Sequence, residues 1–93
     1  MMSSLEELKR IIIVSIEENK DPLIKAAFYS DKDVREIVDR LLERWERAGF
    51  RGAPLDYATY EELKILASKA EFYRDAPREL YLRRLISENL ESP

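Results

Sequence analysis

Apolar residues recur every three or four positions along most of this chain, and that spacing restricts the fold to packed α-helices. The clearest case follows the Ser30-Asp31 pair, an expected N-cap, and ends before Gly49, a residue type common directly after helices. We expect Phe50 to contact Trp45 across that turn, with Trp45 largely buried. The apolar stripe of this helix consists of Val34, Ile37, Val38, Leu41, Leu42 and Trp45.

The N-terminal segment predicts an unusually apolar helix. Ser4 and Glu7 have the spacing of a capping box, which marks the start of a helix. Four consecutive β-branched residues, Ile11–Val14, widen the apolar face to most of the circumference. Such a run also suits a strand, but no second strand is evident, so a helix is favoured. A helix that is apolar all round lies at the centre of a core or is covered by a partner. The main stripe consists of Leu5, Leu8, Ile12 and Ile16.

Helix-breaking and capping residues divide the rest of the chain. Asp21-Pro22 predicts a stop and a short second helix over about residues 22–29. Residues 50–58 form the one expected loop, because they contain Gly52 and Pro54. Thr59 and Glu62 then form a second capping-box pattern ahead of a fourth helix. The stripe of that helix consists of Tyr60, Leu63, Leu66, Ala67, Ala70 and Tyr73.

A last helix is predicted over about residues 77–90, after a break at Asp75-Ala76-Pro77. Its apolar face consists of Leu82, Leu85, Ile86 and Leu90. A length of 93 residues suits one domain that buries a single core. We therefore expect an all-α fold of about five helices, in a small orthogonal or bundle-like single domain spanning residues 1–93.

The chain contains neither cysteine nor histidine. Their absence excludes a disulfide framework, a thiolate zinc site and the usual base of nucleophilic catalysis. No glycine-rich phosphate-binding motif or calcium-binding loop occurs either. We therefore predict a non-catalytic protein, and we assign no catalytic, cofactor-binding or metal-binding residue.

The composition also suggests a setting. Charged residues make up 38% of the chain, glutamine is absent, and only Asn19 and Asn89 are asparagines, a pattern typical of thermophile proteins. The net charge is −3 and no block is strongly basic, so we do not expect the protein to read duplex DNA. The longest aliphatic run, Ile11–Val14, is far shorter than the roughly 18 residues of a membrane span, and no secretory signal is evident. A cytoplasmic location without membrane insertion is expected.

Two acidic pairs leave one enzymatic alternative open. Glu18-x-x-Asp21 and Glu36-x-x-Asp39 each place two carboxylates on one helix face, and carboxylate oxygens are ligands for magnesium. The arrangement resembles that of all-α nucleotide pyrophosphohydrolases of the MazG type. The resemblance implies a magnesium-dependent hydrolase that uses these four residues. Solvated helix faces explain the same pairs, and Asp21 also fits as the N-cap before Pro22.

An arginine row lies opposite the apolar stripe of the third helix. Arginines in a row can bind phosphates or the carboxylates of a partner. Alternatively, Glu36 and Glu43 lie four residues before Arg40 and Arg47, which favours ion pairs within the helix. The row consists of Arg40, Arg44, Arg47 and Arg51.

Residues 69–84 combine basic and aromatic side chains. Lys69, Arg74 and Arg83 alternate with aromatic residues such as Phe72 and Tyr81, a mixture that suits weak binding of single-stranded nucleic acid. The alternative is that the aromatic residues belong to the core and the charges form its solvated edge.

The leading hypothesis rests on surplus aromatic residues. One Trp, five Tyr and three Phe exceed what a five-helix core needs, and Tyr and Trp are enriched at protein interfaces. We therefore predict a helical accessory subunit or adaptor that binds another protein or a second copy of itself, for example within a nucleic-acid-processing machine. The predicted partner-binding residues are Ile13, Tyr29, Phe50, Tyr57, Phe72, Tyr73, Arg40, Arg44, Arg47 and Arg51.

Overall fold

A computed structural model describes residues 4–76 and residue 83 of the chain. Its α-helices are α1 (Leu5–Ile12), α2 (Pro22–Ser30), α3 (Lys32–Arg47) and α4 (Tyr60–Asp75). A π-helical turn, η1 (Ile13–Glu17), continues α1, and a 3₁₀ turn, η2 (Pro54–Tyr57), precedes α4.

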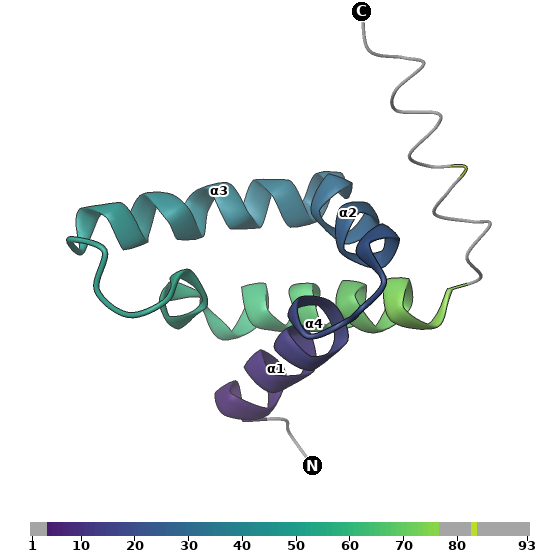
Figure 1. Cartoon of the computed structure of the whole chain (residues 1–93). Coiled ribbons are helices and arrows are strands. Elements are labelled where there is room, and N and C mark those ends of the chain that lie inside the picture. The colour runs from purple at the N-terminus through teal and green to yellow at the C-terminus, as the bar shows by residue number, and fades with distance from the viewer. Residues whose placement is uncertain (1–3, 77–82, 84–93) are drawn as a thin grey trace, which may run out of the picture.

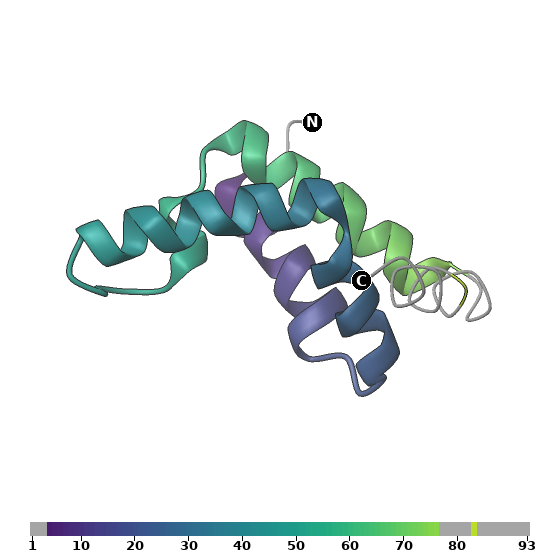
Figure 2. The same cartoon turned by 90° about the horizontal axis from the view of Figure 1, so that it is seen from above.

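The described residues contain helices and no strand, so the all-α prediction is confirmed, and the Ile11–Val14 run is helical. The predicted last helix, residues 77–90, lies outside the described residues. In Figure 1, α3 lies above α4, and the two helices run in opposite directions. Figure 2 shows that α1 crosses α3 steeply. α2 contacts both α3 and α4, and η2 lies against α3.

The N-caps formed where the sequence predicted them. The Ser4 hydroxyl accepts a hydrogen bond from the Glu7 amide at 3.1 Å, and the Asp21 carboxylate accepts one from the amide two residues on at 3.0 Å. Thr59 and Glu62 form both bonds of a capping box. Each cap satisfies a backbone donor that has no partner within its helix.

The C-terminal turn of α3 is also as predicted, but the burial of Trp45 is not. Gly49 adopts a φ of +76°, and the Phe50 amide donates to the Trp45 carbonyl at 2.9 Å, which is the Schellman arrangement. The Trp45 and Phe50 rings meet edge to face at 4.9 Å. Trp45 is only half-buried, because it lies in the last turn of α3 and covers the following loop, where its indole NH donates to the Gly52 carbonyl at 3.0 Å.

The core lies where α1, α2, α3 and α4 meet. The predicted stripes supply most of it, but Leu5 and Leu42 at their edges are 48% and 44% exposed. Three further stripe residues, Val38, Trp45 and Tyr60, are partly buried. The buried apolar residues are Leu8, Ile12, Ile16, Ile24, Ala27, Phe28, Val34, Ile37, Leu41, Leu63, Leu66, Ala67, Ala70 and Tyr73.

Candidate functional site

A pocket of about 400 Å³ opens between α1, η1, α2, α3, α4 and the start of η2. This volume lies in the range of ordinary ligand-binding pockets, roughly 300–1,000 Å³. Glu17 is the one charged residue in its lining, so the walls are almost entirely apolar. The lining consists of Ile12, Ile13, Glu17, Phe28, Tyr29, Val38, Leu41, Leu42, Ala53, Pro54, Leu55 and Leu66.

Three large side chains of this lining are also exposed on the surface. Ile13 is 40% exposed, Tyr29 is 37% exposed and Leu42 is 44% exposed. We refer to these three residues as the pocket mouth. Single exposed apolar side chains are common on protein surfaces, but several around one apolar hollow are the pattern of an interaction site.

The π-helical turn η1 exposes Ile13 at this mouth. The Glu18 amide donates to the Ile13 carbonyl at 2.8 Å, five residues back instead of four. Within the wider turn, Ser15 and Ile16 point inward, while Ile13 and Val14 point outward. Single π-turns within helices are rare and occur frequently at functional sites. The π-helical turn η1 therefore lies on the same side of the molecule as the pocket, which Ile13 and Glu17 of this turn line.

A small polar group lies at one side of the pocket mouth. The Tyr29 hydroxyl donates to the Glu17 carboxylate, and the Lys25 ammonium lies 3.0 Å from the same carboxylate. The hydrogen bond from Tyr29 is the main reason that the pKa of Glu17 falls below its ordinary value. Burial, reinforced by this hydrogen bond, raises the pKa of Tyr29. Glu17 is therefore charged, and Tyr29 neutral, at physiological pH.

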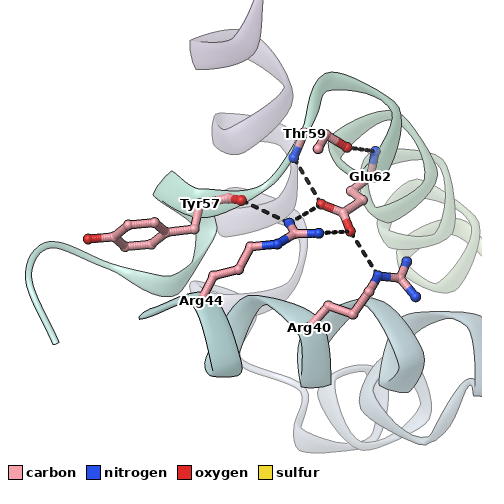
Figure 3. Close-up of polar contacts among 5 residues, drawn as sticks. All are labelled: Arg40, Arg44, Tyr57, Thr59 and Glu62. Atoms are coloured by element: carbon pink, nitrogen blue, oxygen red, sulfur yellow. Dashed lines mark hydrogen bonds and ion pairs between the residues drawn. The ribbon is translucent and has the colours of Figure 1, made fainter. Parts of the chain in front are cut away.

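A buried carboxylate, Glu62, joins α4 to α3 (Figure 3). It accepts hydrogen bonds from Arg44 at 2.5 and 3.1 Å and from Arg40 at 3.0 Å. It also accepts the Thr59 amide at 2.9 Å. Arg44 extends the cluster to the end of η2 by donating to the Tyr57 carbonyl at 2.9 Å. The cluster therefore holds the end of η2 against α3, and the first two residues of η2, Pro54 and Leu55, line the pocket.

The titration of Glu62 should be visible as a loss of stability in acid. Hydrogen bonds from Arg44 lower the pKa of Glu62 from 4.5 to about 2. A carboxylate with a lower pKa in the folded state stabilises the fold above about pH 4.5, and this contribution disappears as the pH falls towards about 2. Other carboxylates titrate in both proteins, so we expect the loss over this range to be smaller in Glu62→Gln than in wild type by on the order of 2 kcal/mol.

Thermal denaturation of both proteins from neutral pH down to about pH 2.5 checks this expectation. Glu61→Gln is the matched control, because the Glu61 side chain is 76% exposed. It should follow the wild-type pH dependence. Parallel curves for wild type and Glu62→Gln would contradict the assignment.

Further polar contacts attach the loop between α3 and α4 to the rest of the domain. The Lys9 ammonium of α1 lies 3.0 Å from the Asp56 carboxylate, which also accepts the Ala53 amide at 3.0 Å. The Tyr57 hydroxyl donates to the Arg51 carbonyl at 2.7 Å. The loop between α3 and α4 thus has defined contacts with both α1 and α3.

The predicted aromatic and aliphatic partner-binding residues occupy different places. Ile13 and Tyr29 lie at the pocket mouth, whereas Phe50 and Phe72 are 59% and 51% exposed at other sites. Tyr73 is 2% exposed and belongs to the core, so its predicted place on a partner-binding surface is wrong. Its position in the apolar stripe of the predicted fourth helix already indicated that Tyr73 is buried.

The predicted arginine row is largely occupied by intramolecular ion pairs. Arg40 and Arg44 bind Glu62, and Arg47 lies 2.6 Å from Glu43, as expected for residues four apart. Tyr57, another predicted partner-binding residue, is half-buried and bonded to the Arg51 carbonyl. Arg51 has its side chain at the surface.

The carboxylates of the enzymatic alternative do not gather into one site. Asp21 caps α2, and Glu36 and Asp39 lie on the exposed side of α3. Among the residues that the structure describes, no group of three or more acidic side chains is placed to hold a metal ion. In the stretch from 69 to 84, Lys69 and Arg74 form ion pairs with nearby carboxylates, and residues 77–82 and 84 lie outside the described residues.

No protein-family model, curated protein or solved structure matches this chain. The function is therefore argued from the pocket and its surroundings. Within the described residues, every helix is too short or too polar to serve as a bilayer-spanning segment.

A second buried polar cluster, which sequence reasoning missed, joins α3 to α4. The Asp31 carboxylate caps α3, accepts the Tyr73 hydroxyl at 2.7 Å and lies 3.1 Å from the Lys69 ammonium. Burial alone would raise the pKa of Asp31, but the hydrogen bonds from Tyr73 and Lys69 lower it overall. The cap was readable from the sequence, whereas its partners on α4 were not.

Proposed function

We propose that this protein is a non-catalytic helical accessory subunit or adaptor, and that it binds another protein through the pocket mouth. The observation that carries the proposal is the grouping of Ile13, Tyr29 and Leu42 around an apolar pocket of about 400 Å³. Well-packed anchor side chains that enter such pockets provide most of the free energy of protein–protein binding.

The surroundings of the pocket favour binding without large rearrangement. Glu62 and Arg44 connect α4, α3 and η2, and Lys9 connects α1 to η2 through Asp56. A wall that is already ordered loses little conformational entropy when a partner binds, so more of the contact energy remains as affinity.

The experiment that tests the proposal introduces a charge at the pocket mouth. Leu42→Glu and Ile13→Glu should each reduce recovery of a native partner by about tenfold or more, because each places a carboxylate in an interface that excludes water. The measurement is affinity capture with the tagged protein, followed by chemical cross-linking and mass spectrometry to locate the contact.

Ile65→Glu is the matched control, because Ile65 lies on α4 outside the pocket and is 43% exposed, almost the same as Leu42. All three variants should melt within a few degrees of wild type, since each replaces a surface residue. The proposal fails if wild type retains no partner, or if Ile65→Glu reduces capture as much as Leu42→Glu does.

A further inference from the structure

Two carboxylates flank the pocket mouth on α3. Asp39 lies three residues before Leu42 and Glu46 lies four residues after it, so all three share one side of the helix. A rise of about 1.5 Å per residue separates Asp39 and Glu46 by about 10 Å along the helix axis, with Leu42 between them. Both acidic residues are exposed, and within the described part of the chain neither forms an ion pair.

The charged residues closest to Leu42 on this side of α3 are acidic. Lys25 neutralises Glu17, to which it is bound at 3.0 Å. The basic residues on this side of α3 are Arg35 and Lys32, which lie one turn and two turns before Asp39, towards the start of the helix. The side of α3 that borders the pocket therefore presents an exposed leucine directly between two unpaired acids, with its basic residues farther from Leu42.

We propose that the pocket mouth receives an amphipathic helix from another protein, and that this helix carries basic residues about seven positions apart. A large apolar side chain between them enters the pocket, while the two basic side chains reach Asp39 and Glu46. This inference rests on the proposed function and specifies its partner.

The geometry of the site favours such a helix over other protein partners. The described residues offer no strand edge to which an extended peptide could add, so the helix-in-groove mode of recognition is the one that fits. A second copy of this chain is disfavoured by charge. A two-fold contact on this face would set Asp39 and Glu46 against the same two carboxylates.

The test uses two synthetic helical peptides of about 18 residues, long enough to be partly helical in isolation. Both carry the same leucine-rich face on an alanine background. One has lysine three positions before and four positions after the central leucine, and the other has glutamate at these positions. Isothermal titration against wild type should show about tenfold tighter binding of the lysine peptide at low salt.

Charge reversal on α3 should exchange this preference. The double variant Asp39→Lys, Glu46→Lys should bind the glutamate peptide more tightly than the lysine peptide. Glu36→Lys, Glu43→Lys is the control, because it makes the same change in net charge at the same spacing on the adjoining side of α3, farther from Leu42, where Glu43 is paired with Arg47. This control should keep the wild-type preference. Leu42→Glu should weaken binding of both peptides.

Each other outcome overturns the inference in an identifiable way. Equal binding of both peptides, lost in Leu42→Glu, would refute the basic partner and leave the proposed function standing. Equal effects of the two double variants would show general charge attraction instead of recognition at this site. A dimer in light scattering that Leu42→Glu dissociates would make a second copy the occupant. Failure of both peptides, together with unchanged partner capture by Leu42→Glu, would refute the proposed function as well.

Discussion

Glu62→Ala is expected to destabilise the protein by about 3 kcal/mol, because the substitution removes the acceptor of two arginines and of a backbone amide at once. Glu62 is 6% exposed, so water does not replace these bonds fully. The melting temperature should fall by about 15 °C for a domain of this size.

Urea denaturation followed by far-ultraviolet circular dichroism measures this effect. Glu61→Ala is the control, since its neighbouring carboxylate is 76% exposed and pairs only with Lys64 among the described residues. It should change the free energy of unfolding by less than about 0.5 kcal/mol. Similar losses in the two variants would show that the cluster in Figure 3 does not carry the stability assigned to it.

Phe28→Ala is expected to cost about 4 kcal/mol, the largest effect of any single truncation considered for this fold. Phe28 is 1% exposed and meets the ring of Tyr29 at 5.0 Å and the ring of Tyr73 at 6.5 Å, both edge to face. Its removal leaves a cavity between α2 and α4 and also widens the pocket that it lines.

Phe72→Ala provides the comparison, because it deletes the same side chain at a position that is 51% exposed. We expect it to cost less than about 1 kcal/mol in the same denaturation experiment. If Phe72→Ala proves as destabilising as Phe28→Ala, the division between core and surface on α2 and α4 is wrong.

The features that sequence reasoning predicted are those set by near neighbours in the chain. The caps at Ser4, Asp21 and Thr59 and the turn at Gly49 depend on contacts within a few residues, so their chemistry is visible in short motifs. The apolar stripes are equally local, because the helix period alone decides which residues share a face.

The features that sequence reasoning missed join residues that are far apart along the chain. Arg44 and Glu62 are 18 positions apart, Tyr73 and Asp31 are 42 apart, and Lys9 and Asp56 are 47 apart. Arg44 was assigned to a solvent-facing row, because nothing nearby in sequence shows that α4 begins beside it. Leu42 was assigned to the core for a related reason. It lies at the edge of the apolar stripe of α3, and only the neighbouring helices decide whether a residue at the edge is covered.

The π-turn η1 has a consequence for the phase of the first helix. Each step of four residues along a regular α-helix turns about 40° beyond a full circle, so Leu8, Ile12 and Ile16 would drift about 80° apart. A wider turn needs more residues for each revolution and removes part of this rotation, which leaves Ile12 and Ile16 both buried. The residues of the Ile11–Val14 run therefore point in different directions around the helix axis. Ile12 points inward, and Ile13 and Val14 point towards solvent. The apolar run therefore spans the junction of α1 and η1, where Ile12 belongs to the core and Ile13 to the exposed surface at the pocket mouth.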